Sequence, residues 1–293
     1  MQKIDVHIHA ALHRQPRRPS PRNPEDCYLA EPPELLAHLE SQGIGRALVM
    51  SSGTRDPETG NDACCRMAAA HPGRLGWMAN IEADTPPEAV AGVLAGCKGR
   101  GAVGIGELAV NEWMDSPRLE AVFAAAETLG LPVTIHMSPE PGYQYGVCDR
   151  PGLPLLEQTL RRHPGLRLLG HSQLFWLEIS GDCPRQGNDA RSRMGRGPVT
   201  PGGRVPALLA ACPNLYADLS AFSASCAILR DEAFGLAFLE TWQDRLLYGT
   251  DTLNRHQVFP LGRFLDRAVA DGRLSRTAYE KICRENARQL FRL

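Results

Sequence analysis

Short apolar runs alternate with amphipathic segments along nearly the whole chain. Eight runs are apolar on consecutive positions rather than on every second one, which is typical of strands that are covered on both faces in a parallel sheet. These runs span residues 4–9, 46–51, 74–81, 101–108, 132–137, 166–171, 215–220 and 246–251. Segments with helical spacing lie between or after them, at 33–42, 61–71, 87–98, 116–129, 153–163, 205–212, 231–242, 261–270 and 275–293.

Eight strand-helix repeats predict one α/β domain, a (β/α)₈ TIM barrel that spans residues 1–293 without a linker. An open doubly wound sheet is the competing architecture, but the first strand-to-helix turn has no GxGxxG motif. Two long connections, residues 10–33 and 173–204, follow strands and are rich in Pro, Gly and Arg. We therefore expect both on the C-terminal face of the barrel, where enzymes of this architecture have their active sites.

Ionisable side chains gather where the predicted strands end, and they predict a metal site at that face. The first strand ends in HIH, and residues two apart on a strand point to the same side. Further candidates end the strands GIGEL, VTIHM, LLGHS and YGTD. Because the strand ends of a barrel surround one mouth, six candidate ligands can meet there: His7, His9, Glu107, His136, His171 and Asp251.

Each of these residues also has an ordinary structural interpretation when it is taken alone. A strand-end histidine can simply be packed or hydrogen-bonded, Glu107 can cap a helix, and Asp251 can begin a turn or helix. Burying four imidazoles and two carboxylates together without a cation would nevertheless cost several kcal/mol for each uncompensated charge. A purely structural zinc site is less consistent with the set, because it lacks Cys and its members are far apart in the sequence.

Composition restricts the remaining classes of function. The formal net charge of −1 argues against electrostatic binding of nucleic acid or of an anionic membrane by the chain as a whole. Nine cysteines without a CxxC pair are expected to be reduced thiols. The start of the chain does not resemble a signal peptide, and no apolar stretch reaches membrane-spanning length, so we expect a cytoplasmic protein. Assembly into a homo-oligomer stays an open possibility.

Arginines accumulate in the two long connections. They are Arg14, Arg17, Arg18 and Arg22 in the first, and Arg185, Arg191, Arg193, Arg196 and Arg204 in the second. A basic excess on one face of a near-neutral chain predicts a small anionic substrate, a carboxylate that a guanidinium binds. The alternative is a solvated, flexible lid. Gln173, Trp176 and Asn254, which follow the sixth and eighth strands, are expected to line the substrate pocket.

The motifs HIH, TIHM, GHSQ, YGTDT and ENARQLFRL resemble the amidohydrolase superfamily, specifically its amidohydrolase-related branch. That branch includes metal-dependent hydrolases and decarboxylases of the aminocarboxymuconate-semialdehyde type. The carbamylated lysine of binuclear amidohydrolases has no counterpart at a strand end of this chain, whereas Glu107 resembles the bridging carboxylate of some other members. The resemblance therefore leaves open whether one or two ions bind.

Mixed nitrogen and oxygen ligands predict a divalent metal, Zn²⁺ before Mn²⁺, Fe²⁺ or Ni²⁺. Such an ion makes water acidic enough to supply hydroxide near neutral pH and polarises a substrate oxygen. Asp251 is the candidate proton acceptor from that water, and His171 either binds a second ion or donates a proton. We expect a metal-dependent hydrolase of a small carboxylated ester, lactone or amide. A metal-dependent decarboxylase and a non-catalytic metal-binding barrel are the alternatives.

Overall fold

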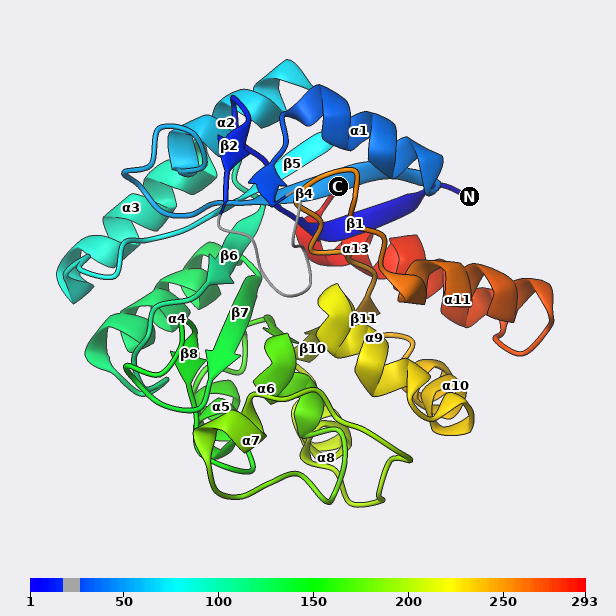
Figure 1. The fold of residues 1–293 in the computed structure, drawn as a ribbon. Coiled ribbons are helices and arrows are strands. Elements are labelled where there is room, and N and C mark those ends of the chain that lie inside the picture. The colour runs from blue at the N-terminus through cyan, green and yellow to red at the C-terminus, as the bar shows by residue number, and fades with distance from the viewer. Residues whose placement is uncertain (18–26) are drawn as a thin grey trace.

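Eight parallel strands form a closed barrel with helices around it, as the ribbon view shows (Figure 1). The computed structural model describes residues 1–17 and 27–293. The barrel strands follow one another in chain order: β1 (Lys3–Ile8), β4 (Ile44–Met50), β5 (Leu75–Ala79), β6 (Gly104–Leu108), β7 (Val133–Ser138), β9 (Leu168–His171), β10 (Leu215–Asp218) and β11 (Leu246–Leu247). The predicted TIM barrel is confirmed.

The barrel closes where the chain leaving β11 meets β1. The backbone N–H of Val6 donates to Tyr248 O at 3.0 Å, and that of Asp251 donates to His7 O at 2.8 Å. A parallel bridge between Ile8 and Thr252 continues the pairing. The last predicted strand, 246–251, is therefore regular only over β11, and its remaining residues turn into the loop that carries Asp251.

Eight of the predicted helices are present with ends shifted by at most two residues. They are α1 (Pro32–Ser41), α2 (Asn61–Ala70), α3 (Pro87–Gly99), α4 (Pro117–Leu129), α5 (Pro154–Arg162), α8 (Arg204–Ala211), α10 (Glu232–Thr241) and α11 (Pro260–Ala270). Local signals explain these starts, because proline occupies the first turn of several helices, where no N–H partner is lost. Ser116 and Asp231 cap α4 and α10 by accepting from Leu119 N and Phe234 N.

Some elements differ from the sequence prediction. Residues predicted as connections contain β2 (Gln15–Pro16), β3 (Tyr28–Leu29), β8 (Val147–Cys148), α6 (Ser172–Leu177), α7 (Asn188–Arg191) and α9 (Ala221–Leu229). The helix α9 has the sequence AFSASCAIL, in which small and polar residues hide the helical period. The predicted helix 275–293 consists of three segments: α12 (Arg276–Glu280), a π-helix (Lys281–Glu285) and α13 (Asn286–Phe291).

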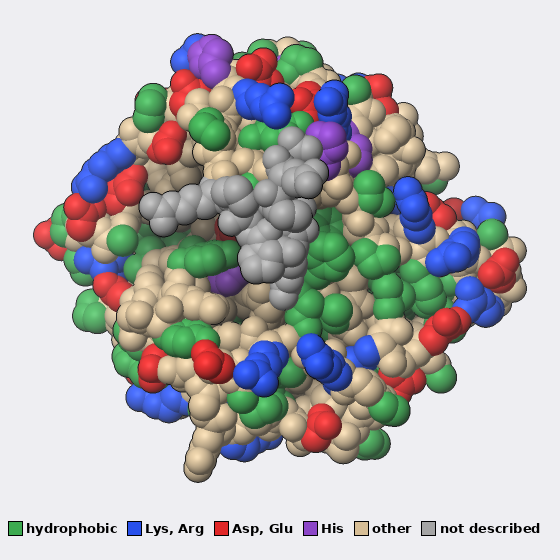
Figure 2. Space-filling view, viewed as in Figure 1, with side chains coloured by type: hydrophobic (Ala, Val, Ile, Leu, Met, Phe, Trp, Pro, Cys, Tyr) green, Lys and Arg blue, Asp and Glu red, His purple; other side chains and the backbone are tan. Residues whose placement is uncertain are grey.

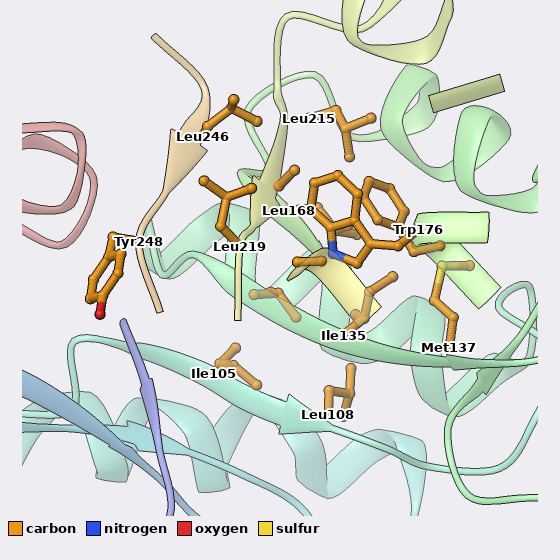
Figure 3. Packing of buried hydrophobic residues seen from close by; sticks show 14 of the residues in the cluster. Ile105, Leu108, Ile135, Met137, Leu168, Trp176, Leu215, Leu219, Leu246 and Tyr248 are labelled. Atoms are coloured by element: carbon orange, nitrogen blue, oxygen red, sulfur yellow. The ribbon is translucent and has the colours of Figure 1, made fainter. Parts of the chain in front are cut away.

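The core has two parts, and together they leave the functional face open. The larger cluster lies between the strands and the outer helices, and Figure 3 shows the ring of Trp176 packed within it. The smaller cluster joins β1, β4, β5, β9 and β11 to Leu290 and Phe291 of α13. Apolar packing thus occupies the end of the barrel where α13 lies, and the cavity described below lies at the carboxyl ends of the strands.

All nine cysteines are free thiols, as predicted. None of the helices in residues 1–17 and 27–293 is long and apolar enough to cross a membrane.

Candidate metal centre and active site

The six predicted ligands meet at the mouth of the barrel. His9, Glu107, His136, His171 and Asp251 line a cavity of about 550 Å³, and His7 lies fully buried directly behind them. The space-filling view looks onto the same face, where histidine surface is visible in a hollow near the centre (Figure 2). Side chains from β1, β6, β7, β9 and the loop after β11 therefore share one site, because parallel strands end at the same rim of the barrel.

Three donor atoms form a compact set suited to one cation. The Nε2 atoms of His7 and His9 lie 3.2 Å apart. Asp251 Oδ1 lies 3.5 Å from His7 Nε2 and 3.1 Å from His9 Nε2. Donor atoms held at about 2.1 Å by a tetrahedral cation are about 3.4 Å from one another. The three atoms are thus spaced as the ligands of a first-row metal are.

Glu107 connects this set to the other two histidines. Its Oε2 lies 3.6 Å from His9 Nε2 and 3.9 Å from His7 Nε2. Its Oε1 accepts from His136 Nδ1 at 2.6 Å and lies 3.6 Å from His171 Nε2. His7, Glu107 and His171 form a second compact set of donor atoms, whereas among the described residues His136 belongs to neither set. His136 lines the same cavity and contacts Glu107.

The buried carboxylates of the cluster favour a positive charge beside them. Burial by itself lowers the pKa of His7, but the negative charges of Asp218, Asp251 and Glu107 outweigh it and raise that pKa to about 10. For the carboxyls of Glu107 and Asp251, burial by itself raises the pKa, and the neighbouring histidines outweigh it and hold both pKa values below the ordinary range. The site therefore keeps its carboxylates ionised and holds a proton on His7.

The residues present fit a divalent cation. Neutral imidazole has one unprotonated nitrogen, and His7 directs its Nδ1 to Asp218 at 2.6 Å. Its Nε2 then carries a lone pair that faces His9 Nε2 at 3.2 Å, and a proton or a metal ion near both nitrogens makes this contact favourable. Two nitrogens with carboxylate oxygens are the donor set that Zn²⁺ and similar metals take.

Metal affinity should rise with pH. Because His7 has a pKa of about 10 in the metal-free protein, it carries a proton at neutral pH, and a cation must displace that proton to use the Nε2 lone pair. We expect affinity to increase about tenfold per pH unit between about pH 6 and pH 8, with release of about one proton from His7. Chelator competition measures the slope, and calorimetry in buffers of different ionisation enthalpy counts the proton. Affinity independent of pH would contradict this assignment.

Backbone geometry at the strand ends aims these side chains. Asp251 and Ser172, the residue after His171, have positive φ values of 61° and 89°, a conformation that is costly for residues other than glycine. Hydrogen bonds hold both turns: Asp251 N–H donates to His7 O at 2.8 Å, and Ser172 Oγ donates to Met137 O at 3.1 Å. The tertiary structure thus imposes the turns that point the ligands into the cavity.

The structure adds two buried carboxylates that the sequence analysis did not select. Asp218, at the end of β10, contacts Nδ1 of His7 at 2.6 Å and Nδ1 of His171 at 3.2 Å. Asp5 accepts from His7 N–H and from Thr250 at both its N–H and its hydroxyl, so it ties β1 to the segment before Asp251. Asp218 lies two residues before the end of the predicted strand 215–220 and ends the observed β10, so a search of the last residues of that strand would have found it.

The three predicted substrate-binding residues have different positions. Gln173 lines the cavity. Trp176 lies in the core with 2% of its surface exposed, and its Nε1–H donates to Asp218 O at 3.1 Å. Asn254 is fully buried and donates to Tyr28 O at 3.0 Å. Neither Trp176 nor Asn254 is among the described residues that line the cavity, because the helix α6 and the loop after β11 turn both side chains into the protein.

Of the rim arginines, only Arg17 lines the cavity in the part of the chain that the structure describes. Arg14 stacks on the ring of Tyr28 at 3.6 Å. Arg185 and Arg204 pair with Glu178 and Glu157, and Arg191 is buried with its guanidinium bonded to Pro139 O and Asp149 O. Arg193 and Arg196 are exposed and are not among the described residues that line the cavity, and Arg18 and Arg22 lie outside the described residues.

A (β/α)₈ barrel with a candidate metal centre at its strand ends defines the class of protein. The family model described as amidohydrolase matches residues 4–293, so the chain belongs to the amidohydrolase family, which consists of metal-dependent enzymes. No curated protein sequence matches the chain.

Solved structures of the same fold cover the whole chain at low sequence identity. An uncharacterised TIM-barrel protein from Bordetella bronchiseptica has a TM-score of 0.68 at 16% identity, and the match covers 100% of this chain and 99% of that one. A probable 2-pyrone-4,6-dicarboxylic acid hydrolase from Acinetobacter baumannii has a TM-score of 0.59 at 14% identity, with 100% of both chains covered. A manganese-bound 5-carboxyvanillate decarboxylase from Novosphingobium aromaticivorans has a TM-score of 0.62 at 14% identity, with coverage of 100% and 97%.

Proposed function

We propose that this protein is a metal-dependent hydrolase of a small, carboxylated ester, lactone or amide. The observation that carries the proposal is the convergence of His7 Nε2, His9 Nε2 and Asp251 Oδ1 within 3.5 Å of one another at the cavity. The ligand chemistry favours Zn²⁺, with Mn²⁺, Fe²⁺ and Ni²⁺ as alternatives. Since both sets of donor atoms need the single lone pair on His7 Nε2, we propose one ion as the working state.

The proposed mechanism assigns a task to each side chain. When bound, a divalent cation polarises a substrate oxygen and makes water more acidic. Asp251, ionised at neutral pH and 27% exposed, faces the cavity and accepts the proton of the attacking water. His171 lies across the site, with Nε2 3.6 Å from Glu107 Oε1, and donates a proton to the leaving group. Gln173 hydrogen-bonds the substrate, and Glu107 holds His136 in place at 2.6 Å.

Arg17 is the proposed contact for the substrate's carboxylate. Its side chain is exposed at the cavity, and within residues 1–17 and 27–293 no carboxylate pairs with it. The cavity wall otherwise carries Glu82, Glu107 and Asp251, so a guanidinium outside the metal cluster gives an anionic substrate a defined orientation.

Replacing Arg17 with alanine should weaken substrate binding more than it slows the reaction. A charge-assisted hydrogen bond contributes about 1.5–3 kcal/mol, so Arg17→Ala should raise KM about 10- to 100-fold and leave kcat within a few fold. The matched control is Arg193→Ala, which removes an exposed rim arginine that is not among the described residues lining the cavity and should leave both constants unchanged. Equal KM values for Arg17→Ala and the wild type would exclude Arg17 as the carboxylate contact.

A decarboxylase is the second candidate, and one feature of the site favours it. His171 is held by Asp218 and Ser220 through Nδ1, at 3.2 Å and 3.0 Å, and its Nε2 is directed to the cavity. A histidine placed in this way can protonate a carbon as well as an oxygen. The similar structure of a 5-carboxyvanillate decarboxylase is consistent with this reaction.

One experiment separates the two reactions. The metal-loaded protein is incubated with carboxylated lactones, esters, amides and hydroxybenzoates in ¹⁸O-labelled water, while carbon dioxide is monitored. Hydrolysis places the heavy oxygen in a carboxylate product without release of carbon dioxide. Decarboxylation releases carbon dioxide and leaves the heavy isotope out of the product's oxygen atoms. A metal-loaded protein that turns over no substrate of either kind would argue for a non-catalytic metal-binding barrel.

A further inference from the structure

A single buried carboxylate lies behind two of the site histidines. Asp218 has no exposed surface, and its Oδ2 lies 2.6 Å from His7 Nδ1 and 3.2 Å from His171 Nδ1. The same oxygen accepts from Ser220 Oγ at 2.8 Å, and Oδ1 accepts from Ser220 N–H at 3.0 Å. Both oxygens of Asp218 are therefore engaged, and the histidines share one of them.

This contact decides which ring nitrogen of each histidine is available. An ionised carboxylate only accepts hydrogen bonds, so His7 and His171 both present Nδ1–H to it. Ser220 Oγ lies 3.0 Å from His171 Nδ1, and it can accept there because its own proton goes to Asp218. In the neutral rings the lone pair is then on Nε2, and both Nε2 atoms face Glu107, at 3.9 Å from His7 and 3.6 Å from His171.

The surroundings leave Asp218 little room to move. Its backbone carbonyl accepts from Trp176 Nε1–H at 3.1 Å, which ties the end of β10 to α6. On the opposite side, a Cβ at Gly249 would lie 2.7 Å from Asp218 Oδ1 and 2.9 Å from Ser220 Cβ. Position 249, in the YGTD segment, therefore requires glycine, because a Cβ there would come too close to Asp218 and Ser220. Asp218 is held between α6 and the segment after β11.

We propose that Asp218 is a positioning residue for both His7 and His171. It orients both rings so that each Nε2 is directed at the metal centre. It acts on the cation only through these histidines. The inference rests on the proposed metal-dependent function, and it makes Asp218 and Ser220 parts of the site although neither is a metal ligand. Removing such a partner of a ligating histidine typically lowers metal affinity 10- to 100-fold.

If Asp218 had only a structural role, its replacement would change metal affinity no more than replacement of another buried aspartate would. Asp149 provides that matched control. Asp149 is also a fully buried aspartate, and it accepts from the backbone N–H groups of Arg150, Leu155 and Leu156 near the start of α5. It contacts none of the described site residues. Asp149→Asn and Asp218→Asn both replace a buried carboxylate with an amide, but only the second changes the support of His7 and His171.

The test compares Zn²⁺ and Mn²⁺ affinities of the wild type, Asp218→Asn and Asp149→Asn by chelator competition. An amide cannot accept at both oxygen positions of Asp218, so we expect affinity to fall 10- to 100-fold in Asp218→Asn and to stay within twofold in Asp149→Asn. Equal affinities of Asp218→Asn and the wild type, or equal losses in both variants, would overturn the inference. A wild type that binds neither metal would instead refute the proposed function.

A second measurement on the wild type decides the question if Asp218→Asn does not fold. Nitrogen-15 spectra of the histidine rings in the zinc-loaded protein show which nitrogen carries the proton. Slowly exchanging Nδ1–H groups on both His7 and His171 are expected. An Nδ1 without a proton on either ring would overturn the inference, because Asp218 could then accept from only one of the two histidines.

Discussion

Asp251→Asn should lower kcat/KM by about 10³-fold or more, the largest effect expected of any single substitution in this protein. Asp251 Oδ1 lies 3.1 Å from His9 Nε2 and 3.5 Å from His7 Nε2, so its charge serves both the cation and the proton of the attacking water. The amide keeps the shape of the side chain but cannot accept that proton. The rate should fall while the fold is retained, because the turn at Asp251 is held by its backbone N–H bond to His7 O.

Steady-state kinetics on the substrate found by the screen, with circular dichroism and metal content measured in parallel, test this prediction. Asp271→Asn is the control, because that residue is exposed at the end of α11, and its substitution should leave the rate unchanged. Wild-type turnover by metal-loaded Asp251→Asn would remove Asp251 from the mechanism.

Removing the metal should abolish activity and lower stability. Glu107, Asp251 and Asp218 place three carboxylates around His7, and a cation bound only by the folded state offsets their repulsion. When free metal exceeds Kd about 1,000-fold, binding adds about 4 kcal/mol to the free energy of unfolding. We therefore expect chelator-treated protein to lose turnover and to unfold at a lower temperature.

Thermal unfolding with and without chelator, followed by separate addition of Zn²⁺ and Mn²⁺, tests this second prediction. Recovery of activity and melting temperature with one ion would identify the metal that the site prefers. Added Mg²⁺, which favours oxygen ligands, is the control and should restore little of either. Activity that is unaffected by complete chelation would contradict a metal-dependent reaction.

Local sequence patterns were sufficient to predict the barrel. Consecutive apolar residues mark strands that are buried on both faces, and prolines and capping residues mark most helix starts. The helix α9 escaped prediction because AFSASCAIL has no clear polar face. The HIH pair could be assigned to one side of β1 because spacing along a strand determines the direction of side chains.

Side-chain direction after a strand end could not be read in the same way. Gln173 and Trp176 lie in the same short helix, yet the first lines the cavity and the second packs in the core and donates to Asp218 O. Asn254 likewise turns inward to Tyr28 O. Their directions depend on how α6 and the loop after β11 pack against the barrel, which is a property of contacts between distant segments.

The sequence by itself determined the class of fold, the rim where the chemistry lies and the residue types available there, because periodicity and strand ends are local properties. Only the tertiary structure decided that His136 contacts Glu107, that Arg17 lies at the cavity among the rim arginines that the structure describes, and that Asp218 contacts both His7 and His171. The physical reason is closure of the barrel. Hydrogen bonds between β1 and the chain after β11 bring residues more than 200 positions apart into contact, and no local pattern encodes which of them meet.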